Sequence, residues 1–116
     1  MKTLFVVMFS SGEYSDRSEY ALCATEDEGV AQACVERLET LFRAVKAKFT
    51  SYKEPEWSVY WAARQAAVEI LKPHAPHEEY LSVDDDSRAW LKQLTVVSAI
   101  PEFATELPDS ASGDAK

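Results

Sequence analysis

The sequence predicts a small α+β domain in which a three-stranded antiparallel sheet, of spatial order 2-1-3, carries two to three helices packed on one face. Three observations support this: a continuous apolar run at residues 3–9, a helical apolar stripe over 30–49, and a β-rich run at 94–100. The 116 residues, 47% of them hydrophobic, suffice for one core. We therefore expect a single α+β domain over residues 1–103 and a disordered acidic tail over 104–116.

The first two strands are predicted to form a β-hairpin. Residues 3–9, TLFVVMF, are apolar at almost every position, which is typical of a central strand covered on both faces. Residues 17–24 follow as a second strand, in which Tyr20 and Leu22 share one face. The segment SSGEYSD at residues 10–16 joins the two strands and has the small polar residues of a tight connection.

The connection SSGEYSD is predicted to be chiefly structural. Gly12 can adopt the positive φ that reverses the chain, and Ser11 or Asp16 can close the turn by local hydrogen bonds. The alternative is a ligand-binding or catalytic site at the hairpin tip, built from Glu13, Tyr14 and Asp16. This alternative requires a concave pocket beside Tyr14 and a shifted carboxylate pKa.

The motif GEYSD at residues 12–16 also carries a resemblance. An N-terminal strand running into this motif, then a second strand and a helix, resembles a group of short, mostly uncharacterised proteins encoded by bacteriophages and their bacterial hosts. The resemblance covers about residues 3–50 and is residue by residue only within the motif. It implies a phage or prophage accessory protein, located in the cytoplasm of the bacterial host, and it transfers no catalytic role.

A long helix is predicted after the hairpin. Thr25, with Glu28 three positions later, is typical of a capping box at a helix start. Apolar residues then recur every three or four positions, so one stripe of the helix faces the sheet. The members of this stripe are Val30, Cys34, Leu38, Leu41, Phe42, Val45 and Phe49.

Residues 56–72, EWSVYWAARQAAVEILK, predict a second helix that Pro73 ends, although the alternation in WSVYW also fits the start of a strand. Trp57 and Trp61 belong to an aromatic stripe that fits either the core or a binding surface. Arg64 in the same stripe favours an interface, because an arginine buried in its own domain needs a carboxylate partner. If this face is left uncovered, a two-fold homodimer is expected to bury it.

The last third of the chain is predicted to contain a loop, a short helix and a strand. Residues 73–86 include two prolines and five acids and predict a connecting loop. A short helix is expected over 87–93, with Asp86 or Ser87 as its N-cap. The third strand is expected over 94–100, where Pro101 limits it.

The charge is concentrated towards the C-terminus. The net charge is −8, and residues 76–116 hold nine acids and three bases, a net of −6. Direct nucleic-acid binding is disfavoured because it depends on clustered Lys and Arg. We therefore expect a non-catalytic protein-binding module that engages a basic surface of a host protein, such as one that binds nucleic acid, and inhibits it. The residues expected to bind this partner are Glu78, Glu79, Asp84, Asp85, Asp86, Trp57, Trp61 and Arg64.

Other classes of site are weakly represented in the sequence. No apolar run approaches the roughly 20 residues of a membrane span. His74 and His77 do not have the spacing of a helical zinc pair, so we expect no metal and no cofactor. Cys23 and Cys34 lack CxxC spacing and are expected to be two buried thiols. No nucleophile is paired with a base by spacing, so the sequence does not predict an enzyme.

Overall fold

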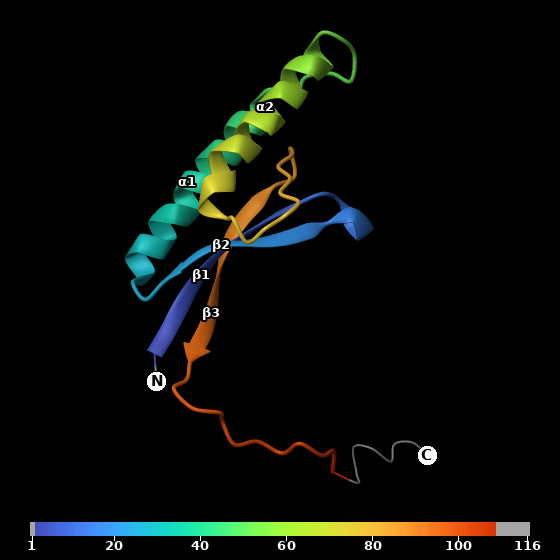
Figure 1. Ribbon diagram of the computed structural model, residues 1–116. Helices are drawn as coiled ribbons and strands as arrows, with labels where there is room; N and C mark the ends of the chain where they lie inside the picture. The colour runs from blue at the N-terminus through green and yellow to red at the C-terminus, as the bar shows by residue number, and fades with distance from the viewer. Residues whose placement is uncertain (1, 109–116) are drawn as a thin grey trace.

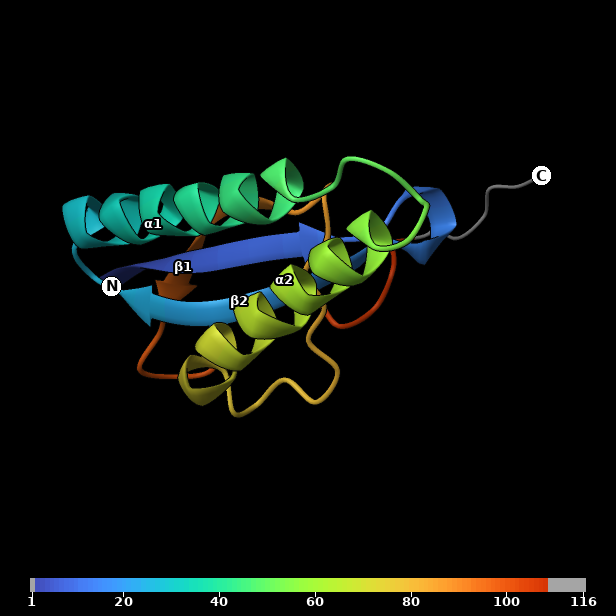
Figure 2. The same cartoon turned by 90° about the horizontal axis from the view of Figure 1, so that it is seen from above.

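The computed structural model describes residues 2–108. The elements follow the order β1 (Lys2–Ser11), a 3-10 turn (Tyr14–Asp16), β2 (Ser18–Thr25), α1 (Glu28–Ala47), α2 (Glu56–Leu71), a 3-10 turn (Lys72–His74) and β3 (Arg88–Val96). Both neighbours of β1 are antiparallel to it, and the sheet order is β2-β1-β3. Both helices lie on the same face of this sheet (Figures 1 and 2). The predicted α+β class, strand order and one-sided helix packing are confirmed.

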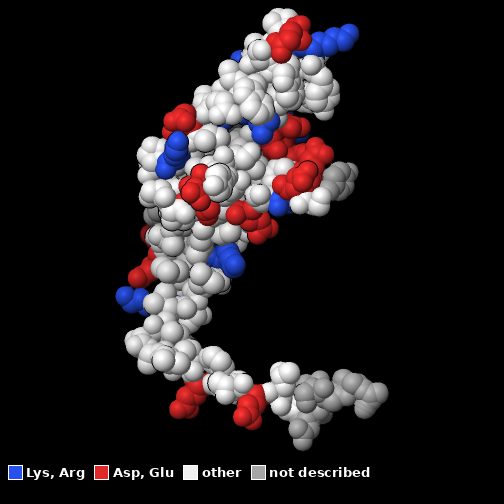
Figure 3. Space-filling view, turned by 45° about the vertical axis from the view of Figure 1, so that its right-hand side comes forward, with Lys and Arg blue, Asp and Glu red and all other residues white. Residues whose placement is uncertain are grey.

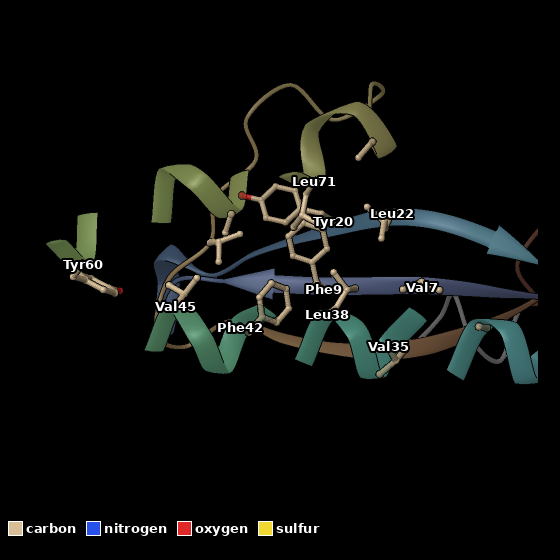
Figure 4. Close-up of a cluster of buried hydrophobic side chains, with 14 residues drawn as sticks. Val7, Phe9, Tyr20, Leu22, Val35, Leu38, Phe42, Val45, Tyr60 and Leu71 are labelled. Carbon is tan, nitrogen blue, oxygen red and sulfur yellow. The ribbon is translucent and has the colours of Figure 1, made fainter. Parts of the chain in front are cut away.

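The core lies between the sheet and the two helices (Figure 4). Phe9 on β1 is fully buried and pairs across the hairpin with Tyr20 on β2, their ring centroids 5.0 Å apart. Phe9 also contacts Phe42 on α1, with ring centroids 5.7 Å apart. Three aromatic rings from three elements thus fix how α1 sits on the hairpin.

The start of α1 differs from the predicted capping box. Asp27 is the N-cap, and its Oδ1 accepts a hydrogen bond from the Val30 backbone N–H at 3.1 Å. The Thr25 hydroxyl instead accepts from the Asp27 N–H at 3.1 Å, one step before the helix. A carboxylate satisfies the free N–H and also interacts with the positive end of the helix dipole, so Asp27 is the better cap.

The buried stripe of α1 agrees with the predicted one except at its start. Val30 is 52% exposed, whereas Ala31 next to it is fully buried. Cys34 is only partly buried. The buried residues of α1 are Ala31, Val35, Leu38, Phe42 and Val45.

The predicted helix over residues 87–93 is wrong, and the predicted third strand is present but lies earlier in the chain than the predicted range 94–100. A single strand, β3, occupies Arg88–Val96 and pairs with β1 from Lys2 opposite Val96 to Ser10 opposite Arg88. The alternation of apolar and polar residues in RAWLKQLTV is too weak to exclude a helix. Pairing with the central strand decides its structure. With no helix at this position, Asp86 and Ser87 cap none.

The apolar run of β1 had predicted a central strand covered on both faces, but the helices cover only one of the two faces (Figure 2). Phe5, Val7 and Phe9 point into the core, whereas Leu4, Val6 and Met8 point to the opposite side of the sheet. There they lie beside side chains of β3 and are not covered by α1 or α2, both of which lie on the other face (Figure 2). Neighbouring side chains of the sheet leave Val6 only 8% exposed and Leu4 and Met8 half-buried. We call this surface the open face; its main residues are Leu4, Val6, Met8, Trp90, Lys92 and Leu94.

The second helix is confirmed. It ends at Leu71, and Pro73 lies in the 3-10 turn that follows. Tyr60, Ala67 and Leu71 are its buried residues. Within residues 2–108, no helix has the length and apolar character needed to cross a bilayer.

Candidate functional site

The connecting loop at residues 73–86, which we call the acidic loop, contacts the hairpin tip at residues 10–16. The sequence had suggested these as two separate sites. The Gly12 backbone N–H donates a hydrogen bond to Oδ2 of Asp84 at 2.8 Å. The other oxygen of Asp84, Oδ1, accepts from the Asp86 N–H at 3.0 Å and from the Ser87 hydroxyl at 3.4 Å. Asp84 therefore uses both carboxylate oxygens within the protein and anchors the loop to the turn.

The turn itself agrees only partly with expectation. Gly12 has φ 91°, as predicted, and the Asp16 N–H donates to the Glu13 carbonyl at 2.9 Å. Asp16 therefore closes the turn by a local hydrogen bond, as expected, but through its backbone N–H, and the Asp84 carboxylate adds a long-range acceptor for Gly12. The Tyr14 side chain lies outside the described part of the structure.

Glu13 lies against Asp86 at this junction. The hydrogen bond between the two carboxyl groups, followed by the negative charge of Asp86, raises the pKa of Glu13, and Asp85 and Asp84 add to this effect. A carboxyl group surrounded by like charges favours its protonated form. We call Glu13, Asp84, Asp85 and Asp86 the acidic tip; Figure 3 shows Asp and Glu side chains gathered on this side, below the far end of the helices.

A second feature is a cluster of aromatic side chains at the end of the helical hairpin that projects beyond the sheet (Figure 1). Tyr52 lies 5.6 Å from Trp57, and Trp57 lies 6.3 Å from Trp61, measured between ring centroids. Tyr52 is 79% exposed and Trp61 is 45% exposed. We call Tyr52, Trp57 and Trp61 the aromatic patch; Trp57 and Trp61 also line an open hollow of about 380 Å³.

Arg64 links the aromatic patch to the acidic loop. Its guanidinium carbon lies 4.6 Å from the Trp61 ring centroid, and its Nε donates to the Val83 carbonyl at 2.8 Å. We expected Arg64 to need a carboxylate or an external partner. Instead, the face of Trp61 and the backbone carbonyl of Val83 contact its guanidinium group.

Tyr60 makes a second link between α2 and the loop. Its hydroxyl donates to Oδ1 of Asp85 at 2.9 Å and accepts from the Asp85 N–H at 3.0 Å. Burial, with the hydrogen bond to Asp85, raises the pKa of Tyr60 to about 12. The phenol thus stays protonated and keeps the loop beside the aromatic patch.

Glu78 and Glu79 have different roles in the structure. Glu78 Oε2 accepts from the Ala21 N–H at 3.1 Å, and the His77 Nε2 lies 2.6 Å from the Ala21 carbonyl oxygen. These contacts satisfy outward-facing backbone groups on the free edge of β2. Glu79 is exposed on the same loop.

A hollow of about 260 Å³ adjoins the acidic tip. Asp85, Asp86, Arg43 and Arg88 are among its lining residues, whereas Glu13 and Asp16 do not line it. On the neighbouring β3, the Ala89 N–H donates to Oε2 of Glu39 at 2.7 Å. The hollow therefore combines both signs of charge.

The cysteines and histidines do not form a metal centre in the described part of the chain. Residues 2–108 contain no group of three His, Cys, Asp or Glu placed to hold a metal ion. Cys23 is exposed, so the prediction of two buried thiols is wrong for this residue. Partial burial, followed by the proximity of Cys34, raises the pKa of the Cys23 thiol.

None of the family models, curated proteins or solved structures compared with this chain matches it. The candidate site therefore rests on the geometry. Sequence reasoning identified most of its residues but missed Tyr52 and the two contacts of Tyr60 with Asp85, because neither the loop conformation nor the helix rotation that creates them has a local sequence signal.

Proposed function

We propose that the chain is a phage-type accessory protein that acts as a non-catalytic protein-binding module and inhibits a host protein by engaging its basic surface. The observation that carries the proposal is the position of Arg64 between Trp61 and Val83. Through this contact the aromatic patch and the acidic tip form neighbouring parts of one surface.

The two parts have complementary physical roles. Exposed tryptophan and tyrosine rings supply the large buried area that dominates binding hot spots. Trp61, 45% exposed above a hollow, is the expected anchor. The carboxylates of Asp85 and Asp86 favour approach by Lys and Arg side chains and increase the association rate. The complementary partner surface is an apolar depression bordered by basic residues.

The proposal is tested by immobilising the protein and capturing partners from a bacterial host lysate at low and at high salt. A captured protein is then identified, purified and titrated directly against the wild type and two variants. Trp61→Ala is expected to weaken binding about tenfold or more. Asp86→Asn is expected to lower mainly the association rate and to reduce its dependence on salt.

Matched controls come from the first half of α1. Val30→Ala removes another exposed apolar side chain, and Glu36→Gln removes another exposed charge. Both are expected to bind like the wild type. No capture at either salt concentration, or equal losses in the controls and the site variants, would contradict the proposal.

Ligand binding at the hairpin tip is the second candidate function: the raised pKa of Glu13 beside Asp86 favours it, whereas the absence of Glu13 and Asp16 from the lining of the adjoining hollow counts against it. A cationic small molecule would relieve the repulsion between these carboxyl groups. The discriminating measurement is a thermal-shift screen of amines and guanidines, with Glu13→Gln as the variant that should lose any stabilisation. A response that Glu13→Gln retains would reject this candidate.

A two-fold dimer through the aromatic patch is the remaining prediction for this surface. It would bury Trp61 against its own copy and would compete with a host partner. Light scattering of Trp61→Ala beside the wild type tests this alternative: a shift of the variant towards monomer would support it, and a variant that dimerises like the wild type would reject it.

A further inference from the structure

The open face of the sheet is an apolar surface that neither helix covers. Trp90 lies beside Met8, and Leu94 lies beside Leu4, in the β1–β3 register. Leu94 is 47% exposed, and Val96 at the end of the same row is 39% exposed. Exposed neighbouring apolar side chains of this kind mark an interaction surface.

The segment that follows β3 is also apolar and lies away from the body. We call residues 97–108 the C-terminal arm; Figures 1 and 3 show it projecting from the end of β3, with open space between it and the sheet. Ile100 is 90% exposed, Phe103 70% and Leu107 73%. The radius of gyration is 19.3 Å, against about 13 Å for a compact chain of about this length, so the molecule is extended.

The arm and the open face match in spacing. In an extended chain, Phe103 and Leu107 point to the same side and are separated by about 13 Å. Leu4 and Met8 are also four residues apart on one strand, and so are Trp90 and Leu94 on the next. Phe103 and Leu107 on the arm therefore have the same spacing as the pairs of apolar residues on β1 and on β3.

The charges match as well. Lys92 extends from the β3 row of the open face and is exposed, whereas Arg88 at the end of the row lines the hollow beside the acidic tip. Glu102 and Glu106 lie next to Phe103 and Leu107 in sequence but on the opposite side of the extended arm, which they share with Ala104. Long basic side chains can lie over apolar neighbours and place their charges at the border of the surface, where these glutamates would pass.

We propose that the C-terminal arm of one copy lies on the open face of a second copy, and that the reciprocal contact forms a two-fold dimer. The occupant is a second copy because the chain bends at residues 98–99 and leaves its own sheet, so the arm does not lie on its own open face (Figure 1). One arm and one face per chain close the assembly without leaving either surface free. This proposal is independent of the aromatic patch and of any host partner.

The experiment is light scattering of the full chain over a wide concentration range. The wild type is expected to be a dimer at high concentration. Phe103→Asp, on the arm, and Leu94→Lys, on the open face, are each expected to raise the dimer dissociation constant at least tenfold. Because both side chains are exposed in the single chain, neither change should unfold it.

Mixing the two variants gives the sharpest test. A heterodimer of Phe103→Asp with Leu94→Lys contains one unaltered arm–face contact and one new Asp–Lys pair, so mixing should restore dimerisation. Ala104→Asp, which adds the same charge on the other side of the arm, and Trp61→Ala are controls expected to dimerise like the wild type. A wild type that stays monomeric at all concentrations, or a dimer that only Trp61→Ala disrupts, would overturn the proposal.

Discussion

The Gly12 N–H and the Asp84 carboxylate, 72 positions apart in the chain, are joined by a hydrogen bond of 2.8 Å. This contact brings the hairpin turn and the acidic loop into one structure. It also separates Asp84 from its neighbours in the run of three aspartates. The residue that looks like one of three equivalent surface charges is a structural link.

Replacement of Asp84 should therefore destabilise the protein, whereas replacement of Asp86 should not. Asp84→Ala removes the acceptor for Gly12 and for the Asp86 N–H, and we expect a loss of about 2 kcal/mol in the free energy of unfolding. Asp86→Ala removes a charge that Glu13 faces and should be neutral or slightly stabilising. Urea denaturation of the two variants measures the difference; equal effects would show that the Gly12 contact contributes nothing.

The fold was more predictable from the sequence than the site was. The apolar run of β1 and the helical periods of α1 and α2 are local signals, and they led to the correct strand order. The assignment of 87–93 failed because RAWLKQLTV fits both periods and only its pairing with β1 decides between them.

The sequence also could not show which acidic residues are structural and which are available to a partner, for a different reason. Glu78 and Asp84 accept hydrogen bonds from backbone groups of β2 and the hairpin turn, which are distant in the chain. Glu79 and Asp86 are chemically the same residue types in the same loop. Only the folded loop distinguishes structural carboxylates from those available to a partner.

Gly12→Ala should be costly because of both backbone conformation and space. The residue has φ 91°, and an added Cβ would lie 2.4 Å from the Asp16 carbonyl oxygen. We expect a loss of about 2 kcal/mol or more. Gly29→Ala in the first turn of α1 is the matched control, since its Cβ would meet only the Asp27 side chain at 3.3 Å. Chemical denaturation should rank the two variants in this order, and the reverse ranking would reject the argument.

Glu78→Ala should expose the free edge of β2. The Ala21 N–H would lose its acceptor, at a cost of about 1 kcal/mol, and an unpaired edge favours association with other chains. Glu79→Ala, an exposed neighbour with the same charge, is the control and should behave like the wild type. Urea denaturation and turbidity on heating measure the two effects. Indistinguishable variants would mean that the loop protects the edge without the Glu78 carboxylate.

Glu13 should make stability depend on pH in a defined direction. The pKa of Glu13 in the folded state is raised from 4.5, mainly by the hydrogen bond to Asp86 and the charge of that residue. A carboxyl group whose folded-state pKa is raised contributes stability below its ordinary pKa, and this contribution is lost as the pH rises through the folded-state value. Glu13→Gln removes the charge that Asp84, Asp85 and Asp86 repel. Its melting temperature should therefore exceed that of the wild type at neutral pH and converge with it at about pH 4. Thermal melts between pH 4 and pH 7 test this, with Glu36→Gln as the control for removal of an exposed charge. If the melting temperature of Glu13→Gln exceeds that of the wild type by the same amount at every pH, the carboxyl groups of the acidic tip do not interact.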